Sequence, residues 1–399
     1  MHTLLSRRIN SFPSSATFVM SKKGKELQQQ GHNIIDLSIG EPHFTTPLYI
    51  QQGAKEAIDQ GDYFSYSPVP GYYDLRVAIA KKLNTENKID CTPEQIVVST
   101  GAKQAIANVL LSLLNPGDAV IIFTPYWVSY KAMVLMAEGV PIFLKGPFKN
   151  NFAPTTAQLE ETITPNTKAV IFSSPCNPTG LVFSKEQLSD IATVIAKYPD
   201  IMVIADEIYE YINFTKTYNS IGALSILKDR VVTINGLSKG HAMTGWRIGY
   251  MAAPMWLATA CEKLQGQITT GACSIAQRAA LTAIQGDNKV VHEMAADYLA
   301  KRNIALSLLA TLPEIHYCIP DGGLFIFIDV RYYLGKSVEN VIMKNVDTLC
   351  MYLLTHAYVV LVPGSAFGEP SFVRLSFGVQ EEQLVTGIAS IKKTLARFY

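Results

Sequence analysis

An excess of charge of either sign is missing from this chain of 399 residues, which has 34 basic and 33 acidic side chains and a formal net charge of +1. The basic residues are scattered and form no long run. Proteins that bind nucleic acid or an anionic membrane surface gather basic residues, so neither partner is expected. No run of about 18 uninterrupted apolar residues occurs, and the sequence therefore predicts no transmembrane helix.

Paired cysteines and metal-binding spacings are missing as well. The six cysteines form no CxxC pair, and the seven histidines show neither HxxxH nor HExxH spacing. This pattern predicts reduced thiols in a reducing compartment, and no metal site. The basic segment MHTLLSRRINSF has features of a mitochondrial transit peptide but is too short to precede the body of the protein, so a cytoplasmic location is expected.

Short apolar runs alternate with amphipathic stretches through the middle of the chain. This alternation is typical of βαβ units, and it predicts an α/β fold with a mostly parallel sheet of the seven-stranded type, flanked by helices. The predicted strands are 96–100, 119–123, 140–144, 168–174, 201–207, 230–235 and 248–253, and the helices between them are 105–114, 128–139, 156–162 and 184–198.

A different pattern follows after about residue 290. It predicts a smaller α+β domain with a helix at 290–310, strands at 322–330, 359–362 and 372–378, a helix around 337–356 and a final helix. The early strand 34–40 is expected to pack with this part. Because the chain is long for a single core, we predict a large domain of residues 48–295 and a small domain of residues 1–47 and 296–399.

The first two predicted strands of the sheet end in groups suited to a phosphate and a flat ring. In an open parallel sheet, ligands collect beyond the carboxyl ends of the strands. Gly101, Ala102 and Lys103 open a helix there, and a helix N-terminus favours a phosphate, although many strand–helix turns look alike. Trp127 follows the next strand, where an indole either stacks on a heterocycle or packs in the core.

Two further strand ends carry an amide and a carboxylate. Asn177 lies between two prolines in SSPCNPTG, a rigid position for an amide that binds a ligand oxygen or simply forms a turn. Asp206 ends an apolar strand, where a carboxylate needs a partner such as a protonated ring nitrogen. Alternatively, Asp206 caps a helix that begins at Glu207, and Tyr209 would then lie on nearly the same face of that helix.

The fifth strand end is the stretch NGLSKGHAMTGWRIGY, residues 235–250. Lys239 in this stretch is suited to form an imine with an aldehyde or to transfer a proton, and Arg247 is suited to bind a phosphate. A single ligand would use all five strand ends, because pyridoxal phosphate has a flat pyridine ring, a phosphate, an aldehyde, a ring nitrogen and a ring hydroxyl. The residues therefore favour an enzyme that holds pyridoxal 5'-phosphate.

A serine hydrolase is the alternative from another class. The pattern GxSxG occurs at 236–240 after a predicted strand, with Ser238 as the nucleophile. The acid and base would come from later residues, Asp287 or Asp321 and His316 or His356. Two glycines where a long helix should follow, and the lack of an HGGG-type loop, speak against this hypothesis. A nucleotide-binding module is disfavoured too, because neither GxGxxG nor GxxxxGK[ST] occurs.

Eight motifs, taken together, resemble the class I aminotransferases of the pyridoxal-phosphate fold-type I superfamily, most of all the bacterial-type aspartate aminotransferase branch. They are SIGEPHFTTP (38–47), YSPVPGYYDLR (66–76), STGAKQA (99–105), NPGDAVIIFTPYWVSY (115–130), SSPCNPTG (173–180), IADEIY (204–209), INGLSKGHAMTGWRIGY (234–250) and VPGSAFGEPSFVRLSFG (362–378). The resemblance implies a homodimer with shared active sites and ping-pong transfer of an amino group from an L-amino acid to a 2-oxo acid.

The resemblance also implies roles for single residues. Lys239 would hold the cofactor and then transfer the proton, Asp206 would pair with the pyridine nitrogen, and Tyr209 and Asn177 would bond to the ring hydroxyl. Trp127 would stack on the ring. The phosphate would be surrounded by Gly101, Ala102, Lys103 and Arg247, and by Tyr66 of the neighbouring subunit.

Substrate contacts are implied in the same way. Arg374 would bind the α-carboxylate, with help from Asn177 and the backbone of Gly40, and Trp127 would line the substrate site. In the resembling branch, a lysine at the position of Lys103 faces the distal carboxylate of aspartate or glutamate, although a lysine at a helix start can also be merely solvated. Aromatic amino acids, prephenate and kynurenine are the alternative substrates.

The chain departs from the family pattern at three places. Cys176 stands where asparagine is more usual, Gly236 stands where some members have a phosphate-binding serine, and Gly240-His241 replaces a common small or aromatic pair. The segment Ser15-Ala16-Thr17 resembles the part of these enzymes that closes over the substrate.

Overall fold

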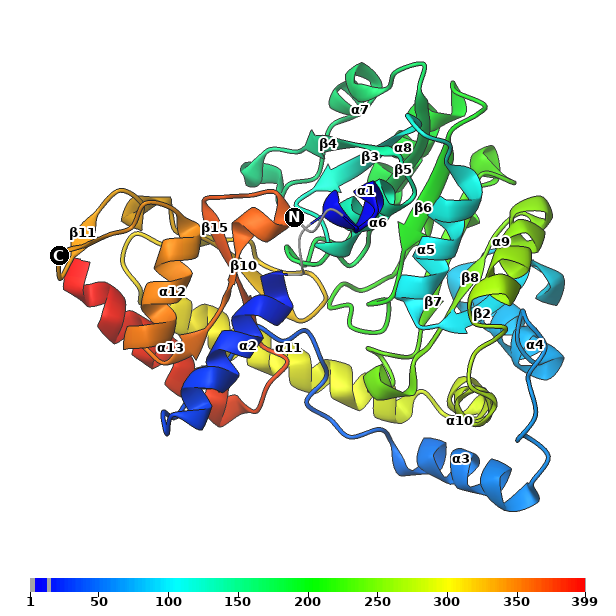
Figure 1. Cartoon of the computed structure of the whole chain (residues 1–399), viewed down its shortest axis with the longest axis horizontal. Helices are drawn as coiled ribbons and strands as arrows, with labels where there is room; N and C mark the ends of the chain where they lie inside the picture. Colours follow the sequence, from blue (N-terminus) through cyan, green and yellow to red (C-terminus); the bar gives the residue numbers. More distant parts are fainter. Residues whose placement is uncertain (1–3, 13–15, 399) are drawn as a thin grey trace.

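The computed structural model describes residues 4–12 and 16–398. The larger part of the structure is built on a seven-stranded sheet (Figure 1). The strand order is β2-β8-β7-β6-β5-β3-β4. Every strand runs in the same direction except β8, which is antiparallel to both of its neighbours. The strands are β2 Ile96–Thr100, β3 Ala119–Thr124, β4 Val140–Lys145, β5 Thr167–Ser173, β6 Met202–Asp206, β7 Val231–Gly236 and β8 Ile248–Ala252.

Helices cover both faces of this sheet. Along β5, Ala169 and Ile171 pack into one apolar core, and Val170 and Phe172 pack into another on the opposite face. Such strands are apolar throughout because neither face meets water. The helices of this part are α3 Leu48–Gln60, α4 Tyr73–Lys82, α5 Ala102–Leu113, α6 Ser129–Met136, α7 Thr156–Thr162, α8 Lys185–Ala196, α9 Met255–Ile268 and α10 Ser274–Gln285.

The seven strands predicted from the sequence are confirmed, each within one residue at either end. The prediction succeeds because each strand is a continuous apolar run, and turn residues separate it from the next helix.

A smaller part of the chain is built on an antiparallel sheet of order β14-β15-β10-β9. Its strands are β9 His316–Tyr317, β10 Phe325–Asp329, β14 Val362–Pro363 and β15 Phe372–Ser376. Around it lie α2 Ala16–Gln29, α11 Lys289–Leu309, α12 Val346–His356 and α13 Glu381–Leu395. The helix α11 extends from the region of α10 towards α13 and so joins the two parts (Figure 1).

The N-terminal strand belongs to this smaller part, as expected. The strand β1, Ile35–Asp36, pairs in parallel with β13, Val359–Val360. The next residue, Leu37, is fully buried in the core of this smaller part. The exact domain boundaries at 47/48 and 295/296 stay a prediction. None of the helices within the described residues is long and apolar enough to cross a membrane.

The helix expected around 337–356 is wrong in its first half. Residues 337–338 and 341–342 pair instead as the hairpin β11–β12, Ser337–Val338 with Val341–Ile342. The two residues of its turn, Glu339 and Asn340, have φ of 50° and 66°, as a tight hairpin turn requires. The helix α12 begins only after Asn345, whose side chain accepts a hydrogen bond from the Thr348 N–H at 2.9 Å.

We expect Ile204→Ala to lower the free energy of unfolding by about 2–5 kcal/mol, because the lost side chain leaves a cavity in a closely packed core. Ile204 lies in β6, the strand that ends at Asp206, and is fully buried. Ile226→Ala is the matched control, because Ile226 is 52% exposed, and it should cost less than about 0.5 kcal/mol. Urea unfolding measures both, and equal losses would contradict this account of the core.

Candidate active site

A cavity of about 590 Å³ opens at the carboxyl ends of the central strands. Its walls come from both parts of the chain. From the larger sheet and its loops come Ala102, Lys103, Trp127, Asn177, Asp206, Tyr209, Ser238, Lys239 and Arg247, and from the smaller part come Thr17, Phe18, Gly40, Glu41 and Arg374. The structure therefore brings together ten of the twelve predicted site residues, the other two being Gly101 and Tyr66.

Asp206 places a buried carboxylate on one wall of this cavity. Its Oδ2 accepts a hydrogen bond from the Tyr130 hydroxyl at 2.7 Å, and its Oδ1 accepts one from the Ile208 N–H at 3.3 Å. Burial raises the pKa of Asp206 to about 6, although both hydrogen bonds oppose this shift. A cation bound beside Asp206 would lower its pKa again, so the site favours a positively charged ligand group there.

Tyr209 reaches the cavity by a different route from the one expected. The helix predicted from Glu207 does not form, and residues 208–211 are turns. The Glu207 N–H donates to the Ile234 carbonyl at 2.8 Å, which extends the pairing of β6 with β7 and holds the backbone out of a helix. Burial raises the pKa of the Tyr209 phenol, so this hydroxyl keeps its proton.

Lys239 lies in the turn that follows β7 and lines the same cavity as Asp206 and Tyr209. Its Nζ donates to the Gly40 carbonyl at 2.7 Å and lies 5.9 Å from the centroid of the Tyr209 ring. Burial lowers the pKa of Lys239, the Glu41 and Asp206 charges oppose this shift and the Arg374 and Arg247 charges add to it, and together they bring the pKa to about 8. An amine with this pKa has a much larger neutral fraction near neutral pH than an ordinary lysine, and nucleophilic attack and proton transfer both require the neutral form.

Arg374 is buried in β15 and faces the cavity from the smaller part of the chain. Its Nη1 donates to Asn177 Oδ1 at 2.9 Å and its Nη2 to the Ser38 carbonyl at 2.5 Å. The guanidinium lies 4.1 Å from the ring centroid of Phe325, and burial lowers its pKa to about 10. Nη1 and Nη2 each carry two N–H groups and each makes one hydrogen bond to the described residues, so the guanidinium keeps donors for a ligand carboxylate in the cavity that it lines.

Arg247 and the start of α5 form a cradle suited to an anion. Arg247 has φ of 59°, and its Nη1 donates to the Thr244 carbonyl at 2.8 Å. A Cβ added at Gly101 would lie 2.4 Å from Arg247 Nη2, and one at Gly249 would lie 2.1 Å from the Ala102 nitrogen. Glycine is favoured at 101 by its φ of 81°, and at 249 because a side chain would meet the backbone of α5. The N-terminus of α5 and a guanidinium therefore meet at one point.

Lys103 and Trp127 lie together on the cavity wall. Lys103 Nζ is 5.0 Å from the centroid of the Trp127 ring. Burial and the nearby Arg247 charge lower the pKa of Lys103. Tyr66 lies elsewhere, because it does not line the cavity and is 91% exposed.

Some residues of the site were missed by the sequence analysis. Tyr130, the hydrogen-bond donor to Asp206, lies in an apolar helix, where nothing in the sequence distinguishes it from a core tyrosine. Glu41 and Phe18 line the cavity from the N-terminal part, as does Thr17 of the segment compared with a closing element. Ser15 of that segment lies outside the described residues.

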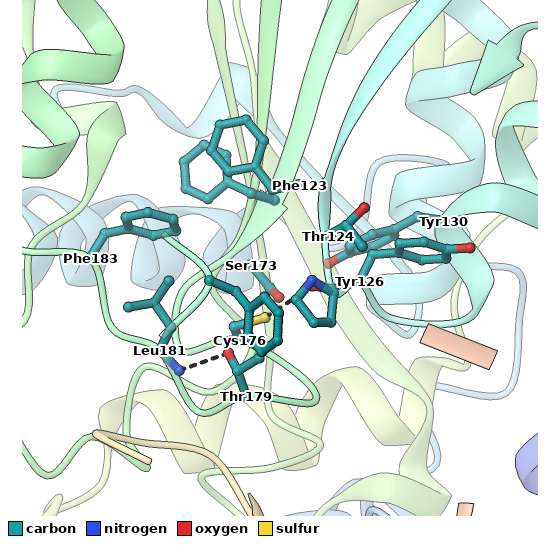
Figure 2. Close-up of a pocket in the computed structure, with 12 residues that line it drawn as sticks. Phe123, Thr124, Tyr126, Tyr130, Ser173, Cys176, Thr179, Leu181 and Phe183 are labelled. Atoms are coloured by element: carbon teal, nitrogen blue, oxygen red, sulfur yellow. Dashed lines mark hydrogen bonds between the residues drawn. The ribbon is translucent and has the colours of Figure 1, made fainter. Parts of the chain in front are cut away.

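The departures from the family pattern lie behind the cavity wall. Cys176 is buried with its Sγ 3.6 Å from the Pro125 carbonyl oxygen, in a small enclosed space that Phe123 and Tyr126 also line (Figure 2). A Cβ added at Gly236 would lie 2.8 Å from the Gly249 Cα, so glycine is required there by the close approach of β7 to β8.

The hydrolase alternative finds no support in this geometry. Ser238 lines the cavity, but turns follow it where a long helix is needed. None of the acids and bases proposed for it, Asp287, Asp321, His316 and His356, lines the cavity.

Comparison with known proteins gives consistent results. The family model "Aminotransferase class I and II" matches residues 32–391. The aspartate/prephenate aminotransferase of Nitrosomonas europaea is 39% identical over 396 residues, which is 98% of this chain and 100% of that protein. A bifunctional aspartate aminotransferase and glutamate/aspartate-prephenate aminotransferase of Petunia hybrida is 38% identical over 396 residues, 98% of this chain and 82% of that protein.

Solved structures agree with the sequence matches. The aspartate aminotransferase from Rhizobium meliloti superimposes with a TM-score of 0.96 and 33% identity, over 100% of both chains. That from Thermus thermophilus with maleate gives 0.92 and 34%, over 99% of this chain and 100% of that one. With matches of this extent in both sequence and structure, the chain belongs to the class I and II aminotransferase family.

Proposed function

We propose that the chain uses pyridoxal 5'-phosphate to move the amino group of an L-amino acid, aspartate or glutamate, to a 2-oxo acid in two half-reactions. The observation that carries this proposal is that one cavity holds Lys239, with its lowered pKa, together with the buried carboxylate of Asp206 and the buried guanidinium of Arg374. An amine, a carboxylate and a guanidinium are the groups that this chemistry requires.

The residues present fit the cofactor. The Lys239 amine would bond to its aldehyde, and Asp206, with its raised pKa, would be stabilised by a protonated ring nitrogen. Trp127 would cover the ring, while Tyr209 and Asn177 would bond to the ring hydroxyl. The phosphate would take the cradle formed by Gly101, by the backbone N–H groups of Ala102 and Lys103 at the start of α5, and by the Arg247 guanidinium, where a side chain at Gly101 would fill the space.

When bound, the cofactor supplies an aldehyde that forms an imine with an amine and a ring that accepts electrons. Lys239 would take the proton from the substrate α-carbon and later return one, for which a pKa of about 8 is suitable. Arg374, assisted by Asn177 and the Gly40 backbone, would hold the α-carboxylate and so fix which bond faces Lys239. Phe18 and Thr17 would help to exclude water from the cavity.

The proposed preference for dicarboxylic substrates rests on Lys103. Its Nζ, held at the Trp127 ring, would pair with a distal carboxylate. Prephenate is the second candidate substrate, because relatives at 38–39% identity are named aspartate/prephenate aminotransferases and because prephenate also carries a second carboxylate. Purely aromatic amino acids and kynurenine are the remaining alternatives.

We further propose a homodimer with shared sites. Tyr66 is 91% exposed and lies outside the cavity of its own chain, so it would be free to reach the phosphate of the neighbouring subunit. All six cysteines are unpaired, which supports the proposed cytoplasmic location. The proposed division into residues 48–295 and residues 1–47 with 296–399 would place the cavity between the two domains.

Lys239→Ala should abolish the imine absorbance band, which differs from that of the free aldehyde, in protein with added pyridoxal phosphate, and should lower kcat by about a hundredfold to ten-thousandfold, because it removes the amine and the proton carrier. Ser238→Ala is the matched control from the same turn and should keep both. Absorbance spectra and an aspartate–2-oxoglutarate assay measure the two effects. A Lys239→Ala protein that keeps the band and the activity would refute the role of Lys239.

The pH dependence of imine formation should report the lowered pKa of Lys239. Only the neutral amine attacks an aldehyde, so in cofactor-free protein the rate with pyridoxal phosphate should rise with pH and level off above about 8. Nα-acetyl-lysine in solution is the control, and its rate should continue to rise towards its ordinary pKa of about 10.4. Stopped-flow absorbance follows both reactions. A protein profile that parallels the control would show that burial does not lower the pKa of Lys239.

Lys103→Ala should lower kcat/KM for aspartate by about tenfold to a hundredfold, since a hydrogen bond to a charged group contributes about 1.5–3 kcal/mol. The value for phenylalanine, which has no distal carboxylate, should change by less than about twofold. Half-reactions with the two amino acids decide this point. If aspartate remains as good a substrate as before, Lys103 does not bind the distal carboxylate.

A further inference from the structure

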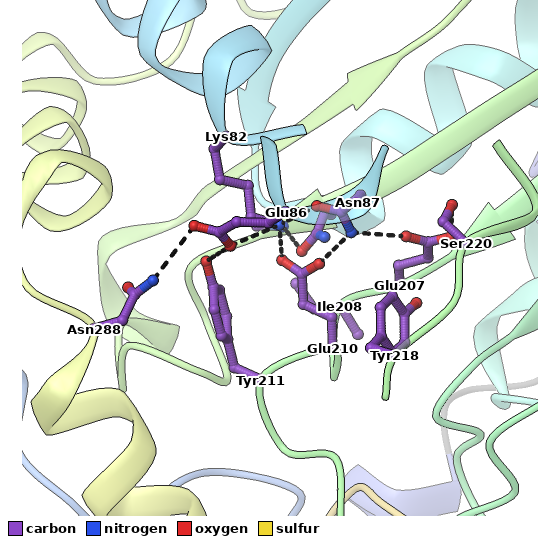
Figure 3. A network of polar contacts seen from close by, with 12 residues as sticks. Lys82, Glu86, Asn87, Glu207, Ile208, Glu210, Tyr211, Tyr218, Ser220 and Asn288 are labelled. Carbon is purple, nitrogen blue, oxygen red and sulfur yellow. Dashed lines mark hydrogen bonds and ion pairs between the residues drawn. The ribbon is translucent and has the colours of Figure 1, made fainter. Parts of the chain in front are cut away.

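The turn that carries Asp206 and Tyr209 has a second, buried side. Asp206 and Tyr209 line the cavity. Glu207 and Glu210 in the same turn are directed away from it and are only 2% and 7% exposed. Figure 3 shows their carboxylates meeting side chains from the end of α4 and from the segment after it. One short turn is therefore anchored from the side opposite the cavity.

The anchor is a closed set of hydrogen bonds around Glu210, which we call the Lys82–Asn87–Glu210 cluster. Lys82 is the last residue of α4, and Asn87 ends the π-helical segment η1, Leu83–Asn87. Lys82 Nζ donates to Glu210 and also to Asn87 Oδ1, the latter at 2.7 Å, and Asn87 Nδ2 donates to the second oxygen of Glu210 at 2.6 Å (Figure 3). Each of the three side chains binds the other two.

Charge is balanced within this cluster. Burial raises the pKa of Glu207 to about 8, so near neutral pH Glu207 is largely protonated. Its Oε1 accepts from the Ser220 hydroxyl at 2.5 Å, and its Oε2 lies 3.5 Å from Asn87 Nδ2. The buried Lys82 ammonium therefore faces one buried carboxylate, Glu210, and the more exposed Glu86 lies farther away, at 3.9 Å.

The same cluster contacts the turn that carries Lys239. Lys82 Nζ lies 5.2 Å from the centroid of the Tyr211 ring, and the Tyr211 hydroxyl donates to Glu86 at 2.7 Å. Tyr211 packs directly on Gly240, where an added Cβ would come within 2.8 Å of it. The buried His241 ring lies perpendicular to the Tyr211 ring, with ring centroids 5.2 Å apart. Tyr211 thus connects the cluster to both residues that follow Lys239.

We propose that the Lys82–Asn87–Glu210 cluster is a positioning element for the reaction: it fixes the 206–211 turn and, through Tyr211, the Lys239 turn in one relative arrangement. The inference rests on the proposed function, because it assumes that Asp206, Tyr209 and Lys239 act on one bound ring. A buried ion pair contributes little to stability compared with apolar residues of similar volume. What this ion pair supplies instead is a set of directional hydrogen bonds that hold the two turns in a fixed relative position.

The test is a set of substitutions in the cofactor-loaded enzyme. Lys82→Met and Glu210→Gln each remove one charge of the buried ion pair. The double variant removes both charges, so neither is left unpaired. Asn87→Ala removes hydrogen bonds without changing any charge. We expect kcat with aspartate to fall by about tenfold to a hundredfold, as small misplacements of reacting groups do. The KM for aspartate should stay within about twofold, because the Arg374 contact is untouched.

Two further readouts separate positioning from stability. The visible circular dichroism of the bound cofactor reports the orientation of its ring and should change in all four variants. The double variant should regain much of the thermal stability that the single variants lose, while kcat and the dichroism stay altered. Asp329→Asn is the matched control, because Asp329 is a buried carboxylate that pairs with Arg331 outside the cavity. It should lower the melting temperature alone.

Each outcome decides the proposal. If the double variant or Asn87→Ala has the kcat and dichroism of the unmodified enzyme, or if kcat recovers together with the melting temperature, the cluster is only structural. A single variant that does not fold leaves the test to the double variant and Asn87→Ala. Failure of the proposed function looks different, since the unmodified protein would then show neither a visible band nor transamination.

Discussion

The cost of burying the Asp206 carboxylate is the constraint on which the rest of the site depends. A carboxylate at the end of an apolar strand is unfavourable unless groups around it compensate, and here burial raises its pKa to about 6. The Tyr130 hydroxyl and the Ile208 N–H compensate in part. A cation bound in the cavity would offset the rest of the cost of burying this carboxylate. The strand β6 is central in its sheet, with β5 and β7 on either side, and this position puts Asp206 in the same cavity as Asn177 and Lys239.

The smaller part of the chain completes the site by adding groups that the seven-stranded sheet does not have. The Gly40 carbonyl holds Lys239 Nζ, and Arg374 bonds across to Asn177. These two contacts link the parts directly at the cavity. A carboxylate bound to Arg374 would therefore be placed relative to Lys239 by the same contacts that hold the two parts together, so binding and orientation have a common structural origin.

Much of the sheet and the polar site could be predicted from the sequence, because both depend on local signals. Continuous apolar runs predicted the strands, and side chains able to bind a ligand at the strand ends predicted the location of the cavity. Properties that depend on distant segments could not be predicted in this way. Tyr130 acquires its role only because α6 packs near the end of β6, and the 337–342 hairpin forms because Glu339 and Asn340 adopt left-handed conformations within a helix-like pattern. The Glu207 turn likewise depends on pairing with β7, which lies beyond the range of local propensity.

The close packing of three glycines around Arg247 and the start of α5 has a consequence for which side chains this part of the fold can accept. An added Cβ at Gly236 would meet Gly249, one at Gly249 would meet the first turn of α5, and one at Gly101 would meet Arg247. At Gly236 and Gly249 the added atom would meet backbone, so a side chain there requires the backbone to move, whereas at Gly101 it would meet the Arg247 side chain. A serine at 236 would require β8 to move away from β7. The spacing between β7, β8 and the start of α5 therefore depends on glycine at 236 and 249.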